Sequence, residues 1–277
     1  MAKFTVTPKH SGLTLLAYLR EVYEEAPSVK AIKRSIDNKG VTINGRVERF
    51  STYKVRAGEV VELHLKEEKR PPAAAILYED DALKVIDKPP GALSENPLHR
   101  LDKETSGVLV LAKSKEAFEA LYLQFKERKA EKLYLAIVDG RVEEDAFQVD
   151  NFLGVKKRYS GGTIYGSVAP KLGKRAITRF KCLVKSKEAT FLECQPKTGR
   201  THQIRVHLKE RGHPVLGDWQ YGQTFQCPLR PERHLLHAYK LVLDHPETGE
   251  RVTFKAPLPK DFLEVQKKLF PRHTFSL

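Results

Sequence analysis

The sequence predicts an α+β fold: a body built on a mixed, mostly antiparallel β-sheet with flanking helices, preceded by a small α/β domain. In several short segments of the body, apolar residues alternate with polar ones or form short runs, as in β-strands. Few segments have the apolar spacing of a long helix. The stretch KEEKRPPAAA at 66–75 is charged, then proline-rich, then small, as linkers are. We therefore expect a domain over residues 1–66, a linker over 67–75 and a second domain over 76–277.

The first domain is expected to hold two short helices and a small sheet. Apolar residues recur at helical spacing over 13–23, and Ser28 can cap a second helix. The pair Asn44-Gly45 follows an alternating segment and is typical of a tight hairpin turn. An apolar segment over 60–65 then predicts a closing strand.

Positive charge dominates the chain and concentrates in the first domain. The net charge is +14 and the pI is about 9.6, which favours polyanionic partners such as a phosphate backbone, although a basic surface can also serve solubility. Charges on a solvated helix usually alternate in sign, but here basic residues crowd the second helix and the hairpin. The residues expected to face RNA are Lys30, Lys33, Arg34, Lys39, Arg46 and Arg49. With the segments GVTINGR and RAGEVVEL, this pattern resembles the small RNA-binding domain named after ribosomal protein S-four.

The body is expected to contain more strand than helix. Strands are predicted at 83–87, 107–112, 132–138, 176–184 and 189–195, and helices at 114–128 and 202–211. Three well-separated cysteines exclude a disulfide framework and a Cys-x-x-Cys zinc motif. No segment approaches the ~20 apolar residues of a membrane helix. We therefore expect a protein of the cytoplasm, without a membrane partner and without a metal.

Asp102 is the candidate catalytic residue. It lies in a polar loop within PLHRLDKETSGVLVLAK (97–113), which runs into an apolar strand. Its basic neighbours Arg100 and Lys103 favour the ionised carboxylate. An ionised carboxylate on a loop carried by a rigid strand suits nucleophilic or base chemistry. Charge and spacing alone nevertheless favour a simpler interpretation, in which Asp102 caps a turn through the backbone of 105–107.

Several motifs in this region occur together in one enzyme family. HRLDKETSG at 99–107 is similar to the signature of the RluA-type pseudouridine synthases, whose aspartate at this point is the essential catalytic residue. The further matches, in the family's order, are YEDDALKVIDKPPG (78–91), AEKLYLAIVDG (130–140), GKRAITRF (173–180), KTGRTHQIRVHLKERGHPVLGD (197–218) and RHLLHA (233–238). The resemblance implies an enzyme that breaks the bond between ribose C1′ and uracil N1, turns the base and rejoins it through C5. Such an isomerisation requires no cofactor.

The resemblance also implies roles for individual residues. Asp102 would either attack the nucleoside or remove a sugar proton, and the sequence does not choose between these routes. Arg205 matches the family arginine that pairs with the aspartate, and Arg200 is the competing choice.

Three further residues are expected at the flipped base. Tyr134 matches the family tyrosine that stacks on the displaced uracil; without the motif it would be a core tyrosine of a strand. Ile204 would pack against the base or in the core, and Arg100 would enter the space that the base leaves.

One departure and one rival interpretation remain. Only ALSENPL (92–98) separates Gly91 from His99, where the family usually has a few tens of residues, so peripheral substrate contacts are expected to differ.

Large-subunit rRNA is the favoured partner because relatives with this first domain often act there. A tRNA partner stays open, and a monomer is expected. The rival is a non-catalytic RNA-binding or ribosome-assembly protein on the same fold.

Overall fold

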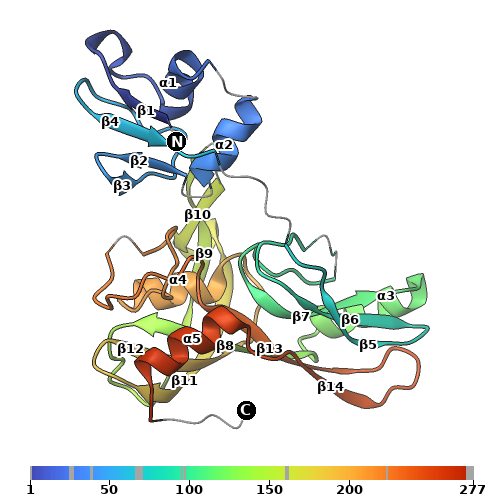
Figure 1. Cartoon of the computed structure of the whole chain (residues 1–277). Helices are drawn as coiled ribbons and strands as arrows, with labels where there is room; N and C mark the ends of the chain where they lie inside the picture. The colour runs from blue at the N-terminus through green and yellow to red at the C-terminus, as the bar shows by residue number, and fades with distance from the viewer. Residues whose placement is uncertain are drawn as a thin grey trace. The chain divides into compact units, whose positions relative to one another are not determined.

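The computed structural model divides the chain into two compact units, each described here by itself (Figure 1). The first unit comprises Met1–Lys69 and Lys157–Ile164, and the second comprises Arg70–Lys156 and Tyr165–Leu277. The structure describes residues 2–24, 28–37, 40–65, 71–94, 96, 98–159, 162–222 and 224–272.

The first unit has a four-stranded sheet in the order β1-β4-β2-β3, with two α-helices. Its elements are β1 Ala2–Thr5, η1 Pro8–His10, α1 Leu15–Val22, α2 Val29–Asp37, β2 Val41–Ile43, β3 Arg46–Val47 and β4 Val60–Leu63. The Thr14 hydroxyl caps α1 and the Ser28 hydroxyl accepts from the Ala31 N–H at 3.1 Å, as expected of N-caps. Asn44 (φ 49°) and Gly45 (φ 76°) are both left-handed, which confirms the predicted hairpin turn.

The second unit is built on a long mixed sheet in the order β10-β9-β11-β12-β8-β13-β7-β6-β5, with β14 paired to β13. The strands are β5 Ala75–Glu79, β6 Leu83–Lys88, β7 Ser106–Ala112, β8 Glu131–Asp139, β9 Ala146–Tyr159, β10 Gly162–Ser167, β11 Lys174–Lys185, β12 Ala189–Pro196, β13 Leu236–Asp244 and β14 Arg251–Lys255. The helices are α3 Lys115–Lys126, η2 Pro170–Leu172, α4 Gln203–Glu210 and α5 Lys260–Leu269. The predicted α+β class and the predicted strands and helices of the body are confirmed.

One parallel contact within this sheet brings distant segments of the chain together. β13 pairs with β7 in parallel at His237↔Ser106 and Ala238↔Gly107, whereas its pairing with β8 is antiparallel. Gly107 has a φ of +114°, and a Cβ there would lie 2.2 Å from the Ala238 carbonyl oxygen. Only glycine permits this approach, so the loop before β7 is held beside the strand that begins at Leu236.

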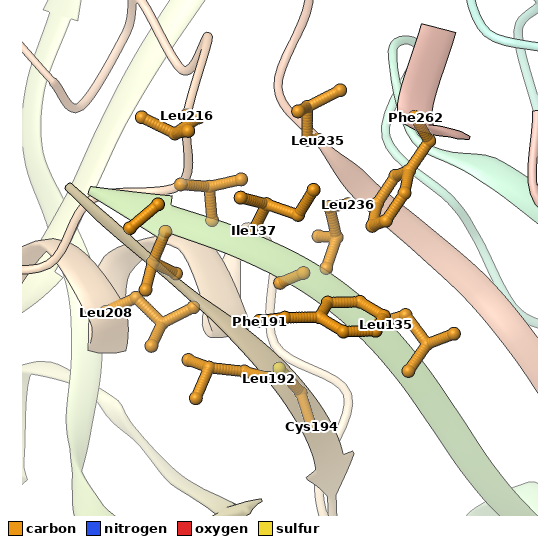
Figure 2. Packing of buried hydrophobic residues seen from close by; sticks show 14 of the residues in the cluster. Leu135, Ile137, Phe191, Leu192, Cys194, Leu208, Leu216, Leu235, Leu236 and Phe262 are labelled. Carbon is orange, nitrogen blue, oxygen red and sulfur yellow. The ribbon is translucent and has the colours of Figure 1, made fainter. Parts of the chain in front are cut away.

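Helices cover both faces of the sheet's centre. The Phe191 ring of β12 lies 5.9 Å from the Phe262 ring of α5. Helix α4 contributes Leu208 to the same buried cluster, part of which Figure 2 shows. The cluster supplies the rigid centre of the second unit.

The face that α4 covers is also the face of Tyr134. Gln203 and His207 of α4 bond the hydroxyl of Thr178. Thr178 lies opposite Pro196 in the sheet, and Cys194 lies opposite Tyr134. Because alternate residues of a strand share a face, Tyr134 lies on the α4 face. In the described chain, no helix is long and apolar enough to cross a membrane.

Candidate active site

Buried polar side chains hold the loop of Asp102. Lys88, at the end of β6, is 1% exposed, and its ammonium donates to the carbonyls of Pro89 (3.0 Å), Ala92 (2.8 Å) and Lys103 (3.0 Å). Burial lowers the pKa of Lys88 to about 8. Three carbonyls from two segments therefore converge on one cation next to Asp102.

The carboxylate of Asp102 does not cap the turn that follows it. The turn closes through the backbone, where the Thr105 N–H donates to the Asp102 carbonyl at 2.9 Å. The Thr105 hydroxyl bonds Nε2 of buried His234 at 2.8 Å. Within the described residues, the polar contacts of the carboxylate are to Arg205 and His202. The simpler capping interpretation of Asp102 is therefore wrong.

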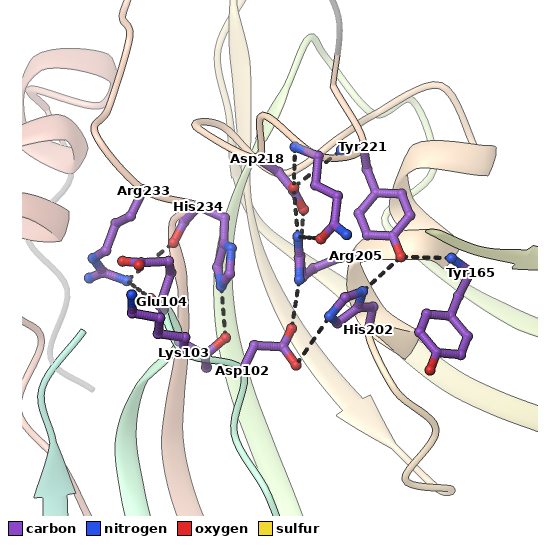
Figure 3. A network of polar contacts seen from close by, with 12 residues as sticks. Asp102, Lys103, Glu104, Tyr165, His202, Arg205, Asp218, Tyr221, Arg233 and His234 are labelled. Atoms are coloured by element: carbon purple, nitrogen blue, oxygen red, sulfur yellow. Dashed lines mark hydrogen bonds and ion pairs between the residues drawn. The ribbon is translucent and has the colours of Figure 1, made fainter. Parts of the chain in front are cut away.

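Arg205 of α4 links Asp102 to a second carboxylate. Nη1 donates to Oδ2 of Asp102 at 2.8 Å, while Nε and Nη2 donate to Asp218 at 2.6 and 2.8 Å (Figure 3). Nη2 also donates to Oε1 of Gln220 at 2.8 Å, and the guanidinium lies 5.0 Å from the ring centre of Tyr221. Burial alone would lower the pKa of Arg205, but the two carboxylates outweigh burial and raise it. Burial alone would raise the pKa of Asp218, but Arg205 outweighs burial and lowers it.

His202 faces the other oxygen of Asp102. Its Nε2 lies 3.8 Å from Oδ1, and its Nδ1 lies 2.8 Å from the hydroxyl of Tyr221. The same hydroxyl accepts a hydrogen bond from the backbone N–H of Tyr165 at 3.1 Å. Burial and then Arg205 lower the pKa of His202 to about 4, so its ring is neutral at pH 7. His202, the residue before α4, has a left-handed φ of 56°, which is uncommon for a residue other than glycine.

The three residues expected at the flipped base lie in different surroundings. Tyr134 packs against Leu101 and Ala238 beside the Asp102 loop, and its pKa is raised by burial and then by Asp102. Ile204 lies in the core cluster, which favours its packing role. Arg100 is exposed.

The competing arginine has another partner. Nε of Arg200 donates to the carbonyl of Arg175 at 3.0 Å, and the backbone N–H of Arg200 donates to Gln203. The structure thus joins Arg205, and not Arg200, to Asp102.

The basic residues expected to face RNA are only partly described. Lys39 lies outside the described residues, and so does the side chain of Lys30. Arg46 is exposed on β3. Lys33, Arg34 and Arg49 are half-buried, and each takes part in a contact within the protein.

The sequence predicted no role for several residues of this network, although Asp218 and Lys88 lie inside the matched motifs. Asp218, Gln220 and Tyr221 follow a helix and carry ordinary turn residues around them, while Lys88 looks like a surface lysine at a strand end. The alternation of β6 buries Leu83 and Val85 and predicts the opposite face for Lys88, so the period gave no signal that Lys88 is buried. Within the described residues, no group of three or more His, Cys, Asp or Glu is placed to hold a metal ion.

The chain is similar to known proteins over both units. Residues 78–210 match the family model described as RNA pseudouridylate synthase. An uncharacterized RNA pseudouridine synthase of Bacillus subtilis is 33% identical over 265 residues, covering 83% of this chain and 85% of the relative. Ribosomal large subunit pseudouridine synthase D of Nitrosomonas europaea is 36% identical over 260 residues, covering 82% and 74%. The solved structure of human RNA pseudouridylate synthase domain containing 4 superposes with a TM-score of 0.60 at 26% identity, covering 70% and 92%. With this ancestry and this site, the chain belongs to the RluA-type family of RNA pseudouridine synthases, which are isomerases that act on RNA.

Proposed function

We propose that this pseudouridine synthase modifies specific uridines of large-subunit ribosomal RNA, with Asp102 as its catalytic carboxylate. The observation that carries the proposal is the ion pair between Asp102 and Arg205, with Asp218 behind it. Arg205 holds Oδ2 of Asp102, so Oδ1 is the oxygen left for the substrate. A fixed carboxylate with one free oxygen suits the chemistry at a ribose carbon.

The reaction is an internal rearrangement of the nucleotide. The bond between C1′ and N1 breaks, the uracil turns, and C5 bonds to C1′. The proton leaves C5 and N1 gains one, so uridine and product have the same composition. Oδ1 of Asp102 either attacks the sugar or removes a sugar proton, and both routes place this oxygen at the ribose. No oxidant, reductant or group donor is consumed.

Reaching the ribose and base requires the target uridine to leave its stack. Flipping costs a few kcal/mol, and less in a loop. Tyr134 offers a ring on which the uracil stacks, worth about 1–3 kcal/mol, and exposed Arg100 is available to enter the space left behind. The partly buried phenol retains its proton because burial raises its pKa.

Positive charge is expected to bring RNA to the enzyme. The net charge of +14 attracts phosphate backbone, and we assign residues 1–66 to an RNA-binding domain similar to that of ribosomal protein S-four. Ribosomal RNA is favoured over tRNA because relatives such as the Nitrosomonas europaea and Vibrio vulnificus proteins are named ribosomal large subunit pseudouridine synthase D. We expect the enzyme to act as a monomer.

The test is chemical mapping of pseudouridine in unmodified large-subunit rRNA and in tRNA transcripts. Wild-type protein should create pseudouridine at a few defined sites of the rRNA, and Asp102→Asn should create none while still binding it. Modification of tRNA alone would overturn the rRNA assignment. An Asp102→Asn variant as active as wild type would overturn the role of the carboxylate.

A further inference from the structure

Lys132 lies on the active-site face of β8, two residues before Tyr134. Alternate strand residues share a face, so both side chains lie on the side that α4 covers. The pairing of β8 with β12 ends at Tyr134↔Cys194, so Lys132 lies two residues beyond it, near the point where the chain leaves β12 and turns towards α4. Its ammonium reaches that turn: Nζ is 3.6 Å from the position that a Cβ on Gly199 would occupy.

The charge of Lys132 has no partner among the described residues. Its ammonium makes no hydrogen bond and no ion pair there, although the side chain is half-buried. Burial lowers the pKa of Lys132 to about 8, so the group is still mostly cationic at pH 7. The pKa of the half-buried His99 ring is lowered first by desolvation and then by the charge of Lys132, so Nζ lies near that ring. Holding a partly desolvated cation without an anion is unfavourable, which indicates that a ligand supplies the anion.

Gly199 carries no side chain on the side of this ammonium. Its φ is not in the left-handed region, so its backbone does not require glycine. Lys132 Nζ is the one described heavy atom that a Cβ at this position would meet within 4 Å, and 3.6 Å is ordinary contact. An alanine would therefore fit, and its methyl would lie against the ammonium. Glycine therefore places no side chain over Nζ at this exposed turn.

A second cation borders the same turn. Arg200 uses Nε to bond the Arg175 carbonyl at 3.0 Å, and within the described chain its terminal amines have no partner. Arg200 also precedes Arg205 by five residues, so the turn leads directly into the helix that holds Asp102. An ammonium and a guanidinium thus flank an exposed glycine beside the catalytic network.

We propose that Lys132 and Arg200 form a binding site, open at Gly199, for a phosphate of the RNA backbone next to the target uridine. The inference rests on the proposed function, because it needs RNA to be the occupant. A phosphodiester oxygen would accept from both cations, and the ribose attached to it would be drawn towards Asp102. The site would thereby position the backbone on either side of the flipped nucleotide.

The experiment uses single-turnover modification and equilibrium binding of an unmodified large-subunit rRNA transcript by the full chain. Lys132→Met should raise the half-saturating enzyme concentration about tenfold, as expected for loss of a charged hydrogen bond. It should also reduce the slope of log affinity against log salt by about 0.7–0.9, the value for one phosphate contact. Lys132→Arg should restore most of the affinity. Gly199→Ala should weaken binding in the same direction.

Lys187→Met is the matched control, because Lys187 is exposed at the opposite end of β12 and loses the same charge. Equal effects of Lys132→Met and Lys187→Met on affinity and salt slope would overturn the proposal. If Lys132→Met lowers the melting temperature, Gly199→Ala carries the test, and wild-type affinity in that variant would overturn it. If wild type modifies nothing, the proposed function fails, while the binding measurements still decide the phosphate site.

Discussion

Asp218→Asn is the sharpest test of how Arg205 is held. Asp218 is 1% exposed and takes two hydrogen bonds from Arg205, at 2.6 and 2.8 Å. An asparagine supplies one acceptor and turns an NH2 group towards the guanidinium, so a buried cation loses its main counter-charge. Breaking a buried pair in this way costs about 3–5 kcal/mol. At about 2–4 °C per kcal/mol for a unit of this size, the melting temperature should fall by roughly 6–20 °C.

Asp261→Asn is the control, because Asp261 also receives two bonds from a buried arginine, Arg233, at 2.6 and 3.0 Å. The side chain of Asp261 is 48% exposed, so its pair is worth only about 0–1 kcal/mol. Both variants should be measured by urea unfolding and by pseudouridine formation on an rRNA transcript. Asp218→Asn should lose activity at least tenfold at a temperature where it is folded, and Asp261→Asn should keep it within threefold. Equal stability losses in the two variants, or full activity of Asp218→Asn, would refute the reasoning.

Three other outcomes are expected. Gly107→Ala should destabilise the protein by more than ~3 kcal/mol in urea unfolding, because its methyl would lie 2.2 Å from the Ala238 oxygen; Gly249→Ala, also left-handed but with open space around it, should cost only ~1 kcal/mol. Lys88 has a pKa of about 8 in the folded state and 10.5 in the unfolded state. Between pH 8 and 10.5 the unfolded chain therefore binds more protons at this lysine than the folded chain does. The unfolding free energy of wild type relative to Lys88→Met should therefore rise by ~1–3 kcal/mol from pH 8 to 10.5, and a flat difference would contradict the burial of the charge. Removal of residues 1–66 should weaken RNA binding and flatten its salt dependence in titrations at several salt concentrations; unchanged affinity and slope would disprove an RNA-binding role for that domain.

The elements that the sequence predicted are those with a strong apolar period. β8 and β12 lie in the centre of the sheet, and their apolar runs reflect burial on both faces. β9 was missed because FQVDNFLGVKKRY mixes charges into its strand period. The short helix α5 was missed for a related reason: half of its ten residues, KDFLEVQKKL, are charged, which obscures the spacing of the buried Phe262, Gln266 and Leu269.

The residues of the site likewise differ in how far the sequence predicted them. Asp102, Tyr134 and Arg205 stand in recognisable motifs, and the structure places the first and last of them 2.8 Å apart. Asp218 and Lys88 also lie in matched motifs, but the sequence assigned no role to either, because a buried charge and a solvated one are the same letter. What makes them functional is the partner: a guanidinium for Asp218, and carbonyls up to 15 residues away for Lys88. Such partners are defined only once the strands are in register.

The forked contact of Arg205 has a consequence for the charge balance through the catalytic cycle. Asp218 neutralises the buried guanidinium by itself, so the charge of Asp102 is additional and the three groups together carry one negative charge. In the proposed reaction Asp102 becomes a sugar ester or takes up a proton, and the remaining Arg205–Asp218 pair is then electrically neutral. No uncompensated cation is left in the low-dielectric interior at the moment when the nucleophile or base is consumed. The Arg205–Asp218 pair therefore accommodates both charge states of Asp102, whichever of the two proposed routes applies.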